Sequence, residues 1–408
     1  MGSGVLFVHN NFPAQFRDLA QTLMARGASC AAIGAHTSPG IPDLQQARYK
    51  LGRGTTPGIF SLAVRAEADL IRARASLKAA RYLQDAGFEP QVIVGHPGWG
   101  ETLFLDEVWP KARRVMFSEF FYHGHGVDVG FDTEFSTPTE EAALIAKGKN
   151  AVMTLALAEA DAIVAPTPFQ ASVLPSVFSP RVRIIHEGVD VDAIRPGPAE
   201  PFALDDGRVI RPGTPVITHI NNNMEPLRGL HIFARALPAV LKAVPDAQVI
   251  VIGQAAKSGY GGTAPDDLTW QDVCLRGVEL DPQRVHFLGK VEHARMLAAL
   301  RLSTAHVYYT YPFVLSWSLS EAMASGGYVI GSDTAPLRDA IEDGVSGRLL
   351  PFFDVEALSE ALIAACRDPA ATAPMREAAR AAAVAKFNRA TGRAAWLDLL
   401  REQGLTLP

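Results

Sequence analysis

Cysteine is scarce in this chain, with three residues in 408. Cys30, Cys274 and Cys366 stand far apart, so they form no C-x-x-C pair and supply too few ligands for a structural zinc site. Scattered single cysteines are typical of a reducing compartment, and we expect a cytoplasmic protein. The sequence also lacks a run of about 18 apolar residues, which argues against a membrane-spanning helix.

An excess of positive charge is missing as well. The chain has 38 Lys and Arg against 43 Asp and Glu, for a net charge of −5. A dedicated nucleic-acid binder usually carries a basic excess, so we expect no nucleic-acid partner. Hydrophobic residues make up 48% and charged residues 20%, a composition typical of a folded globular protein.

Three common catalytic signatures are absent. The sequence has no G-x-x-x-x-G-K-[ST] loop, which excludes a P-loop nucleotidase. The turn after the first predicted strand reads His9-Asn10-Asn11-Phe12 rather than G-x-G-x-x-G, which argues against a nicotinamide dehydrogenase. A G-x-S-x-G nucleophile elbow is missing too.

Short apolar runs alternate with helical patterns along most of the chain. This alternation predicts parallel sheets with helices on both faces, an α/β class. We expect a long helix over 139–160 and another from 375 to about 400. The predicted strands are 5–8, 30–33, 91–94, 114–117, 162–165, 182–185, 216–220, 247–252, 285–287, 305–308 and 328–331.

The proline-rich stretch over 195–214 suggests a domain boundary. We therefore expect an N-terminal Rossmann-like domain over 1–195 and a C-terminal one over 196–387. Ligands of doubly wound sheets bind beyond the carboxyl ends of the strands, so the loops there are the candidate sites.

In the second half, a predicted strand runs through a loop into a helix that contains Glu321. Backbone N–H groups at such a helix start, near Ser316 and Trp317, suit a phosphate. Glu321 could accept hydrogen bonds from a ribose. The spacing of Ser318 and Glu321 also fits a capping box, which needs no ligand.

Arg228 follows another predicted strand and could pair with a diphosphate, because a planar guanidinium matches two phosphate oxygens. The alternative is a solvated surface arginine. The turn at Gly289, Lys290 and Val291 could present backbone to a nucleobase, or could simply end a strand.

In the first half, the glycine-rich run 95–100 contains His96 and allows close backbone approach to a ligand. Glu119 and His125 follow the next predicted strand. His123-x-His125 and Asp190-x-Asp192 are the only short metal-like patterns, and both are weak evidence for a metal.

Five segments together resemble family 4 of the retaining glycosyltransferases, which have the GT-B fold. H-E-G-V-D at 186–190 is similar to that family's N-G-V-D element, and E-A-M-A-S-G at 321–326 to its E-A-M-A-x-G. The other three are E-P-L-R-G at 225–229, R-V-H-F-L-G at 284–289 and G-V-S-G-R-L-L at 344–350. H-P-G-W-G-E at 96–101 and Y-P-F-V-L-S-W-S at 311–318 are similar to a bacterial subgroup.

The resemblance implies two Rossmann-like domains facing each other across a cleft, with a C-terminal helix over 388–408 crossing back onto the first. It implies a UDP- or GDP-sugar donor, retention of anomeric configuration and no metal. Arg228 would meet the diphosphate, with Ser316 and Trp317 beside it. Glu321 would take the ribose, and residues 289–291 the base.

On this resemblance the acceptor, whether glycan, lipid-linked or protein, would contact the N-terminal domain, and peripheral membrane association stays open. His96, Glu119 and His125 are the candidate catalytic contacts, with Asn10 near them. The sequence departs from the family pattern at Phe313, where the first of two spaced glutamates is expected, and at Asn222 or Asn223, where an arginine is expected. A catalytically silent nucleotide- or glycan-binding protein and a GT-B epimerase or phosphorylase are the alternatives.

Overall fold

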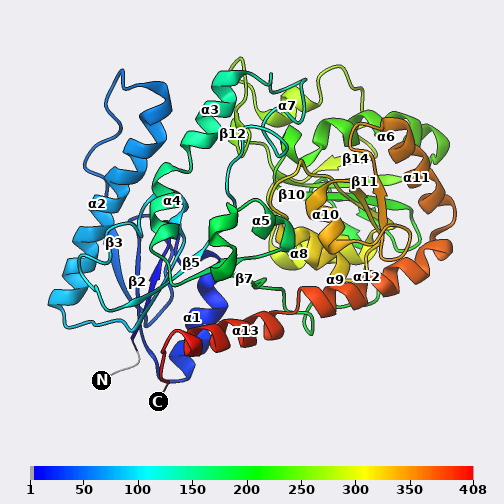
Figure 1. Ribbon diagram of the computed structural model, residues 1–408. Coiled ribbons are helices and arrows are strands. Elements are labelled where there is room, and N and C mark those ends of the chain that lie inside the picture. Colours follow the sequence, from blue (N-terminus) through cyan, green and yellow to red (C-terminus); the bar gives the residue numbers. More distant parts are fainter. Residues whose placement is uncertain (1–3, 408) are drawn as a thin grey trace. The chain divides into compact units, whose positions relative to one another are not determined.

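The computed structural model describes residues 4–407, which fold into two compact units. Unit 1 extends to Glu187 and resumes at Ala390, and unit 2 is Gly188–Arg389. Each unit is built on one large parallel sheet with helices on both faces (Figure 1). The expected α/β class with two doubly wound sheets is therefore confirmed, while the expected bounds at 195 and 387 stay predictions.

Unit 1 holds a seven-stranded parallel sheet in the order β3-β2-β1-β4-β5-β6-β7. The order reverses between β1 and β4, which makes this pair the switch point of the sheet. Its elements are β1 (Gly4–Val8), α1 (Arg17–Ala25), β2 (Ser29–Ala35), β3 (Gln45–Tyr49), α2 (Val64–Asp85), β4 (Val92–Gly95), β5 (Arg113–Phe117), α3 (Glu140–Gly148), α4 (Ala151–Ala158), β6 (Ala162–Ala165), α5 (Pro168–Ser172), β7 (Val182–Ile184) and most of α13 (Arg389–Glu402).

The alternation of side chains along β1 explains why both faces of this sheet are covered. Val5 and Phe7 belong to one apolar cluster with residues of α1 and α13, whereas Leu6 and Val8 belong to another with residues of α2. All four are fully buried, as expected for a central parallel strand. The returning helix α13 contributes Trp396, whose ring packs 6.5 Å from Phe16.

Unit 2 holds a six-stranded parallel sheet in the order β14-β11-β10-β15-β16-β17, whose switch point is between β10 and β15. Its main elements are β10 (Val216–Asn223), α6 (Leu230–Ala243), β11 (Gln248–Gln254), α7 (Trp270–Cys274), β14 (Val285–Phe287), α8 (His293–Leu302), β15 (Ala305–Tyr308), α9 (Trp317–Ala324), β16 (Val329–Ser332), α10 (Ala335–Ala340), β17 (Arg348–Leu350), α11 (Val355–Arg367) and α12 (Ala373–Lys386). Two small antiparallel ladders complete it, β8 (Phe202–Ala203) with β9 (Val209–Ile210), and β12 (Ser258–Gly259) with β13 (Gly262–Thr263).

Two predicted long helices are each broken into two, and the breaks have identifiable causes. Between α3 and α4, the side chain of Asn150 bonds both backbone groups of Tyr122, at 2.9 and 2.7 Å. Between α12 and α13, Val189 donates its N–H to Phe387 O at 2.8 Å and accepts the N–H of Arg389 at 3.0 Å. The predictions of single helices over 139–160 and 375–400 were wrong: the first is interrupted at the turn that Asn150 ties to Tyr122, and at the second the backbone groups of Phe387 and Arg389 pair with Val189 instead of continuing the local ladder.

None of the helices within residues 4–407 combines the length and apolar character needed to cross a bilayer.

Candidate functional site

Arg228 lies beyond the carboxyl end of β10, at the switch point of unit 2. The 3₁₀ turn Pro226–Arg228 leads into Gly229, whose φ of +69° is a left-handed conformation that starts α6. A Cβ on Gly229 would lie 2.4 Å from Cβ of Tyr309, so glycine also permits this close approach to the chain after β15. The turn buries Arg228, which is 3% exposed.

The guanidinium of Arg228 is held by neutral acceptors. Its Nη1 donates to Thr310 Oγ1 at 3.0 Å, to Val314 O at 2.9 Å and to Tyr308 Oη at 3.3 Å. In the described part of the chain, no carboxylate forms an ion pair with it within 4.0 Å. The alternative of a solvated surface arginine is therefore wrong. A buried guanidinium with no carboxylate in contact is costly unless something anionic joins it.

Two aromatic rings lie next to this guanidinium. Its Cζ is 5.6 Å from the ring centroid of Tyr260 and 5.9 Å from that of Phe313, and the two rings are 5.4 Å apart. Cation–π contacts of this kind stabilise a desolvated guanidinium without neutralising it. Phe313 is 5% exposed, so the position that a glutamate takes in the family pattern is here an apolar wall.

Glu225 holds the hairpin that carries Tyr260. Its Oε2 accepts the N–H of Gly261 at 3.3 Å, and a Cβ on Gly259 would lie 2.2 Å from the same oxygen. Burial raises the pKa of Glu225, and the hydrogen bond from Gly261 and the positive charge of Arg228 oppose that shift. Glu225 thus positions the aromatic neighbour of Arg228 instead of forming an ion pair with it.

Helix α9 starts at the same switch point, beyond β15. Its N-cap residue is Ser316, whose N–H donates to Tyr308 Oη at 2.7 Å. Ser318 Oγ donates to Ile220 O at 3.0 Å, so the proposed capping box of Ser318 with Glu321 is wrong. Trp317 is the first helical residue, and its side chain is 48% exposed.

Glu321 pairs with a residue of α8. Its Oε1 lies 2.7 Å from Nε2 of His293, and its side chain is only 12% exposed. Burial raises the pKa of Glu321, while the hydrogen bond from His293 lowers it. His293 follows Val291 by two residues, so the Glu321–His293 pair adjoins the turn predicted to read a base.

That turn, residues 289–291, lies at the carboxyl end of β14. Gly289 has φ +63° and its carbonyl accepts the N–H of Gly253 at 3.0 Å. Lys290 is exposed, and Val291 packs partly against the unit 2 core. The structure places these residues two strands from β10, on the same edge of the sheet as Arg228.

Unit 1 has its own cluster at its switch point, formed by His9 after β1 and His96 after β4. Their ring centroids are 5.3 Å apart, and Trp99 stacks on His96 at 4.3 Å. His9 Nδ1 accepts the N–H of Asn11 at 2.9 Å. Burial, with a contribution from His96, lowers the pKa of His9 to about 3, which makes this ring a neutral group.

His96 and Glu119 are brought together across β4 and β5. His96 Nδ1 accepts the N–H of Gly98 at 3.1 Å, so its proton is on Nε2, which lies 3.6 Å from Glu119 Oε2. Nε2 is buried and has no hydrogen-bond partner among the described residues. The Glu119 side chain is 46% exposed. His125 is exposed in the loop that follows, outside the described contacts of this pair.

Helix α2 supports the loop that carries His96. Arg65 pairs with the buried Asp69 at 2.8 Å and also donates to Gly98 O. Gly100 has φ +94°, and a Cβ there would lie 2.2 Å from Asp69 O. These contacts fix the loop on a helix that the sequence pattern did not identify.

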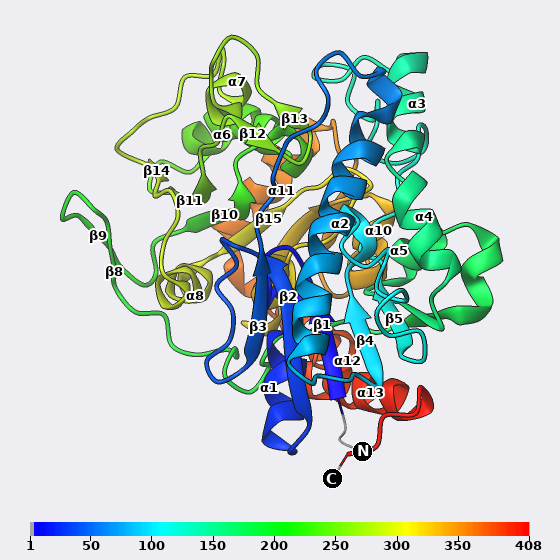
Figure 2. The ribbon, with the colours of Figure 1, turned by 90° about the vertical axis from the view of Figure 1, so that its left-hand side faces the viewer.

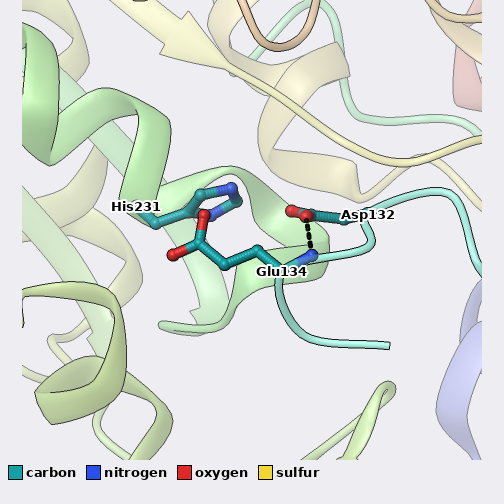
Figure 3. A group of neighbouring side chains, drawn as sticks. All are labelled: Asp132, Glu134 and His231. Carbon is teal, nitrogen blue, oxygen red and sulfur yellow. Dashed lines mark hydrogen bonds between the residues drawn. The ribbon is translucent and has the colours of Figure 1, made fainter. Parts of the chain in front are cut away.

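The short metal-like patterns have other partners. His123 Nε2 lies 2.6 Å from Val173 O, and Asp190 Oδ1 accepts the N–H groups of Asp192 and Ala193 at 3.2 and 3.0 Å. Asp132 Oδ1 accepts the N–H of Glu134 at 3.0 Å (Figure 3). His231, labelled in the same figure, belongs to unit 2, where its ring lies 5.9 Å from Phe352.

Comparison with known proteins now identifies the class. Residues 26–194 match the Glycosyl transferase family 4 group, and residues 214–368 match Glycosyl transferases group 1. Together with the two parallel α/β units, these matches place the chain in the family 4/group 1 glycosyltransferases of GT-B fold. The expected family is confirmed.

Particular relatives agree with this placement. Phosphatidyl-myo-inositol mannosyltransferase of Mycolicibacterium smegmatis is 30% identical over 188 residues, which are 45% of this chain and 42% of the relative. The matched stretch thus spans about two fifths of that relative's length. Sucrose-phosphate synthase of Thermosynechococcus elongatus has a TM-score of 0.70 at 18% identity, with 98% of each chain covered. Anabaena Alr3699/HepE in complex with UDP-glucose has a TM-score of 0.65 at 16% sequence identity, with 98% of this chain and 99% of that chain covered. At these identities the structures show the fold alone.

Several residues around Arg228 and Glu321 in unit 2 were not predicted as site residues. Tyr260, Tyr308, Thr310 and His293 join Arg228 or Glu321 only through the fold. Their one sequence signal is position, since Tyr308 ends β15, Thr310 follows it closely and His293 starts α8. Tyr260 is in a hairpin with no strand-like pattern around it.

Proposed function

We propose that this protein transfers a sugar from a nucleoside-diphosphate sugar to an acceptor hydroxyl, with retention of anomeric configuration and without a metal. The observation that carries the proposal is the buried Arg228, held by neutral acceptors at the switch point of unit 2. All three side-chain hydrogen bonds of Arg228 among the described residues use Nη1, and in this proposal Nη2 donates to a ligand oxygen.

The leaving diphosphate would be stabilised by fixed positive groups. Arg228 supplies a full charge in a dry environment, and the start of α9 supplies the positive end of a helix dipole. Both follow neighbouring strands of the same sheet. Together they can stabilise the negative charge of the leaving pyrophosphate, which is the role of a bound cation in other transferases.

The rest of the donor would extend toward α8. Glu321 and His293 offer a carboxylate and an imidazole to the ribose hydroxyls, and residues 289–291 offer backbone groups to the base. UDP is the first nucleotide to test, because Alr3699/HepE is described in complex with UDP-glucose. GDP is the second.

The acceptor hydroxyl would be contacted by residues of unit 1. His96 and Glu119 form a pair in which the buried Nε2 lies 3.6 Å from a half-exposed carboxylate, and Asn10 and His125 belong to the loops around them. In the reaction, the acceptor oxygen bonds to C1 of the sugar, the bond from C1 to the phosphate oxygen breaks, and the hydroxyl proton passes to the departing phosphate. The relatives named for inositol-containing substrates suggest a polyol acceptor.

A thermal-shift screen with UDP, GDP, ADP and dTDP, with and without EDTA, tests donor binding. A ligand at 100 times its Kd stabilises the folded state by about 2.7 kcal/mol. We expect one nucleotide to raise the melting temperature equally in both buffers. Stabilisation that EDTA abolishes would contradict the metal-independent mechanism.

Phe313 favours a second candidate, a GT-B protein that binds a nucleotide sugar without transferring it. The family pattern has a carboxylate at this position, and the buried ring cannot hydrogen bond to a sugar hydroxyl. Radiolabelled UDP- and GDP-sugars separate the two candidates. Binding without hydrolysis, and without transfer to inositol phosphates or lipids, would support the silent protein.

A further inference from the structure

The guanidinium proposed to bind the donor diphosphate is covered in this structure. Arg228 is only 3% exposed, and the ring of Tyr260 lies over its guanidinium, with the centroid 5.6 Å from Cζ. A phosphate oxygen has to come within about 2.7–2.9 Å of a guanidinium nitrogen to accept its hydrogen bond. An anion therefore reaches Arg228 only after one of the covering groups has moved away.

Most of the groups around this guanidinium are fixed by burial. They belong to one segment at and after the end of β15, and each is at most 5% exposed: Tyr308, Thr310, Phe313 and Val314. Moving any of them would disrupt a close-packed interior. Tyr260 is the exception, because it is 53% exposed and lies at the tip of a hairpin.

The hairpin that carries Tyr260 is small. Its strands β12 and β13 pair at two positions, Ser258 with Thr263 and Gly259 with Gly262, and they lie close to α7 (Figure 2). A two-stranded hairpin has little stability of its own, so its position depends on contacts to the rest of unit 2. The hairpin can therefore move as a body without unfolding the sheet beneath it.

Two hydrogen bonds connect the turn of this hairpin to its surroundings. Glu225 Oε2 accepts the N–H of Gly261 at 3.3 Å, and Trp270 Nε1 donates to Gly262 O at 3.1 Å. The first is long for an N–H···O bond, and water replaces much of what either contributes when it breaks. These bonds position the hairpin but leave it free to open.

We propose that Tyr260 gates the diphosphate site. In the closed hairpin its ring takes the place on the guanidinium of Arg228 that a phosphate needs, and the hairpin swings outward before the donor binds. A cation–π contact with a desolvated guanidinium favours the closed hairpin by roughly 30-fold. The identity of the admitted anion rests on the proposed function, whereas the closed state rests on the contacts of Arg228 alone.

Labelling of the full chain with phenylglyoxal, which modifies accessible guanidinium groups, tests the closed state without a nucleotide. Mass spectrometry compares the labelling rate at Arg228 with that at the exposed Arg211 in the same sample. In the wild type, Arg228 should react much more slowly than Arg211. Tyr260→Ala should raise the rate at Arg228 by about 30-fold and leave the rate at Arg211 unchanged.

Three further variants serve as comparisons. Tyr260→Phe keeps a ring over the guanidinium, so Arg228 should be labelled at nearly the wild-type rate. Trp270→Phe removes the hydrogen bond to Gly262 O and should raise the rate about fivefold, because it loosens the hairpin from its other side. Tyr82→Ala truncates a tyrosine that is 65% exposed in unit 1 and should have no effect. Tyr260→Ala should keep the wild-type melting temperature, since its side chain is exposed.

Calorimetric titration with pyrophosphate, UDP and GDP measures the consequence for binding. Tyr260→Ala should bind a diphosphate up to about 30-fold more tightly than the wild type, because the ligand no longer has to displace the ring. Weaker binding by this variant would overturn the gate and make Tyr260 a contact of the ligand.

The labelling and binding results fail in different ways. Labelling of Arg228 at the rate of Arg211 in the wild type, or an unchanged rate in Tyr260→Ala, would overturn the gate whatever the protein binds. If labelling rises as expected but neither form binds pyrophosphate, UDP or GDP, the closed hairpin is supported and the proposed function is contradicted.

Discussion

The guanidinium of Arg228 lies 5.9 Å from the ring centroid of Phe313, and both side chains are almost fully buried. The family pattern has a carboxylate where this ring stands, and a carboxylate beside Arg228 would neutralise it. The aromatic ring leaves the positive charge available to a ligand. From this arrangement we expect affinity for a diphosphate, with contacts to the donor sugar that differ from those of the family pattern.

Substitution of Arg228 by Lys keeps a cation but removes the planar fork that can span two phosphate oxygens. We expect nucleoside-diphosphate affinity to fall by about 1.5–3 kcal/mol, the usual contribution of a hydrogen bond to a charged group. Isothermal titration with UDP and GDP measures the change. The exposed Arg211→Lys variant is the control, and unchanged affinity in Arg228→Lys would remove this residue from the diphosphate site.

Glu321→Gln should weaken nucleotide binding about tenfold, because an amide is a poorer acceptor for ribose hydroxyls than a carboxylate. Burial raises the pKa of Glu321, so neutralising it should leave stability unchanged or slightly higher. Calorimetric titration and a melting curve report the two effects separately, with the exposed neighbour Glu292→Gln as control. A lower melting temperature at full affinity would show that the His293 pair is structural.

Glu119→Gln should slow sugar transfer by roughly 10- to 100-fold, as for loss of a charged hydrogen-bond partner that orients the acceptor hydroxyl, and leave nucleotide affinity unchanged. We expect an effect on transfer without an effect on affinity because Glu119 is in unit 1, whereas the proposed donor residues are in unit 2. Release of nucleoside diphosphate in the presence of acceptor measures transfer, and the exposed Glu107→Gln is the control. If Glu119 and His96 act as a pair, the double variant with His96→Gln should be little worse than either single one.

Gly229→Ala should destabilise the protein by about 3 kcal/mol, from left-handed strain and a clash with Tyr309. Gly213 is a matched control, because its φ of +92° is also left-handed but its Cβ would meet open space. Gly213→Ala should therefore cost only about 1 kcal/mol. Denaturant unfolding compares the two, and equal costs would show that the close approach to Tyr309 relaxes easily.

The fully buried His306 should make the protein sensitive to acid. Burial lowers its pKa to about 3, whereas in the unfolded chain it titrates near 6.5. Between these values the unfolded state binds the proton and the folded state does not, so stability falls as pH falls through this window. The slope is about 1.4 kcal/mol per pH unit for this histidine.

Denaturant unfolding of wild type and His306→Asn between pH 7 and pH 4.5 isolates that contribution. The variant should be less stable at pH 7, because Nδ1 of His306 lies 2.9 Å from Thr218 Oγ1, but it should lose less on acidification. The exposed His36→Asn serves as control. Parallel pH profiles for His306→Asn and wild type would contradict a depressed pKa.

Much of the architecture could be predicted because its signals are local. Apolar runs such as Val5–Val8 and the helix starts after them follow from side-chain periodicity. Five short motifs in the expected order were enough to predict the family. The strand β3 and helix α2 escaped prediction. The hydrophobic residues of α2 are few, and it buries alanines together with Asp69 and Ser76, so its pattern is not that of an amphipathic helix.

What the sequence determined by itself was the α/β class, the family, and the positions of Arg228 and Glu321 at strand and helix ends. Only the tertiary structure decided that Arg228 is buried among neutral acceptors and that Glu321 meets His293. The physical reason is that burial and pairing depend on groups far apart in the chain, such as Arg228 and Val314, which are separated by 86 residues and which no local pattern records.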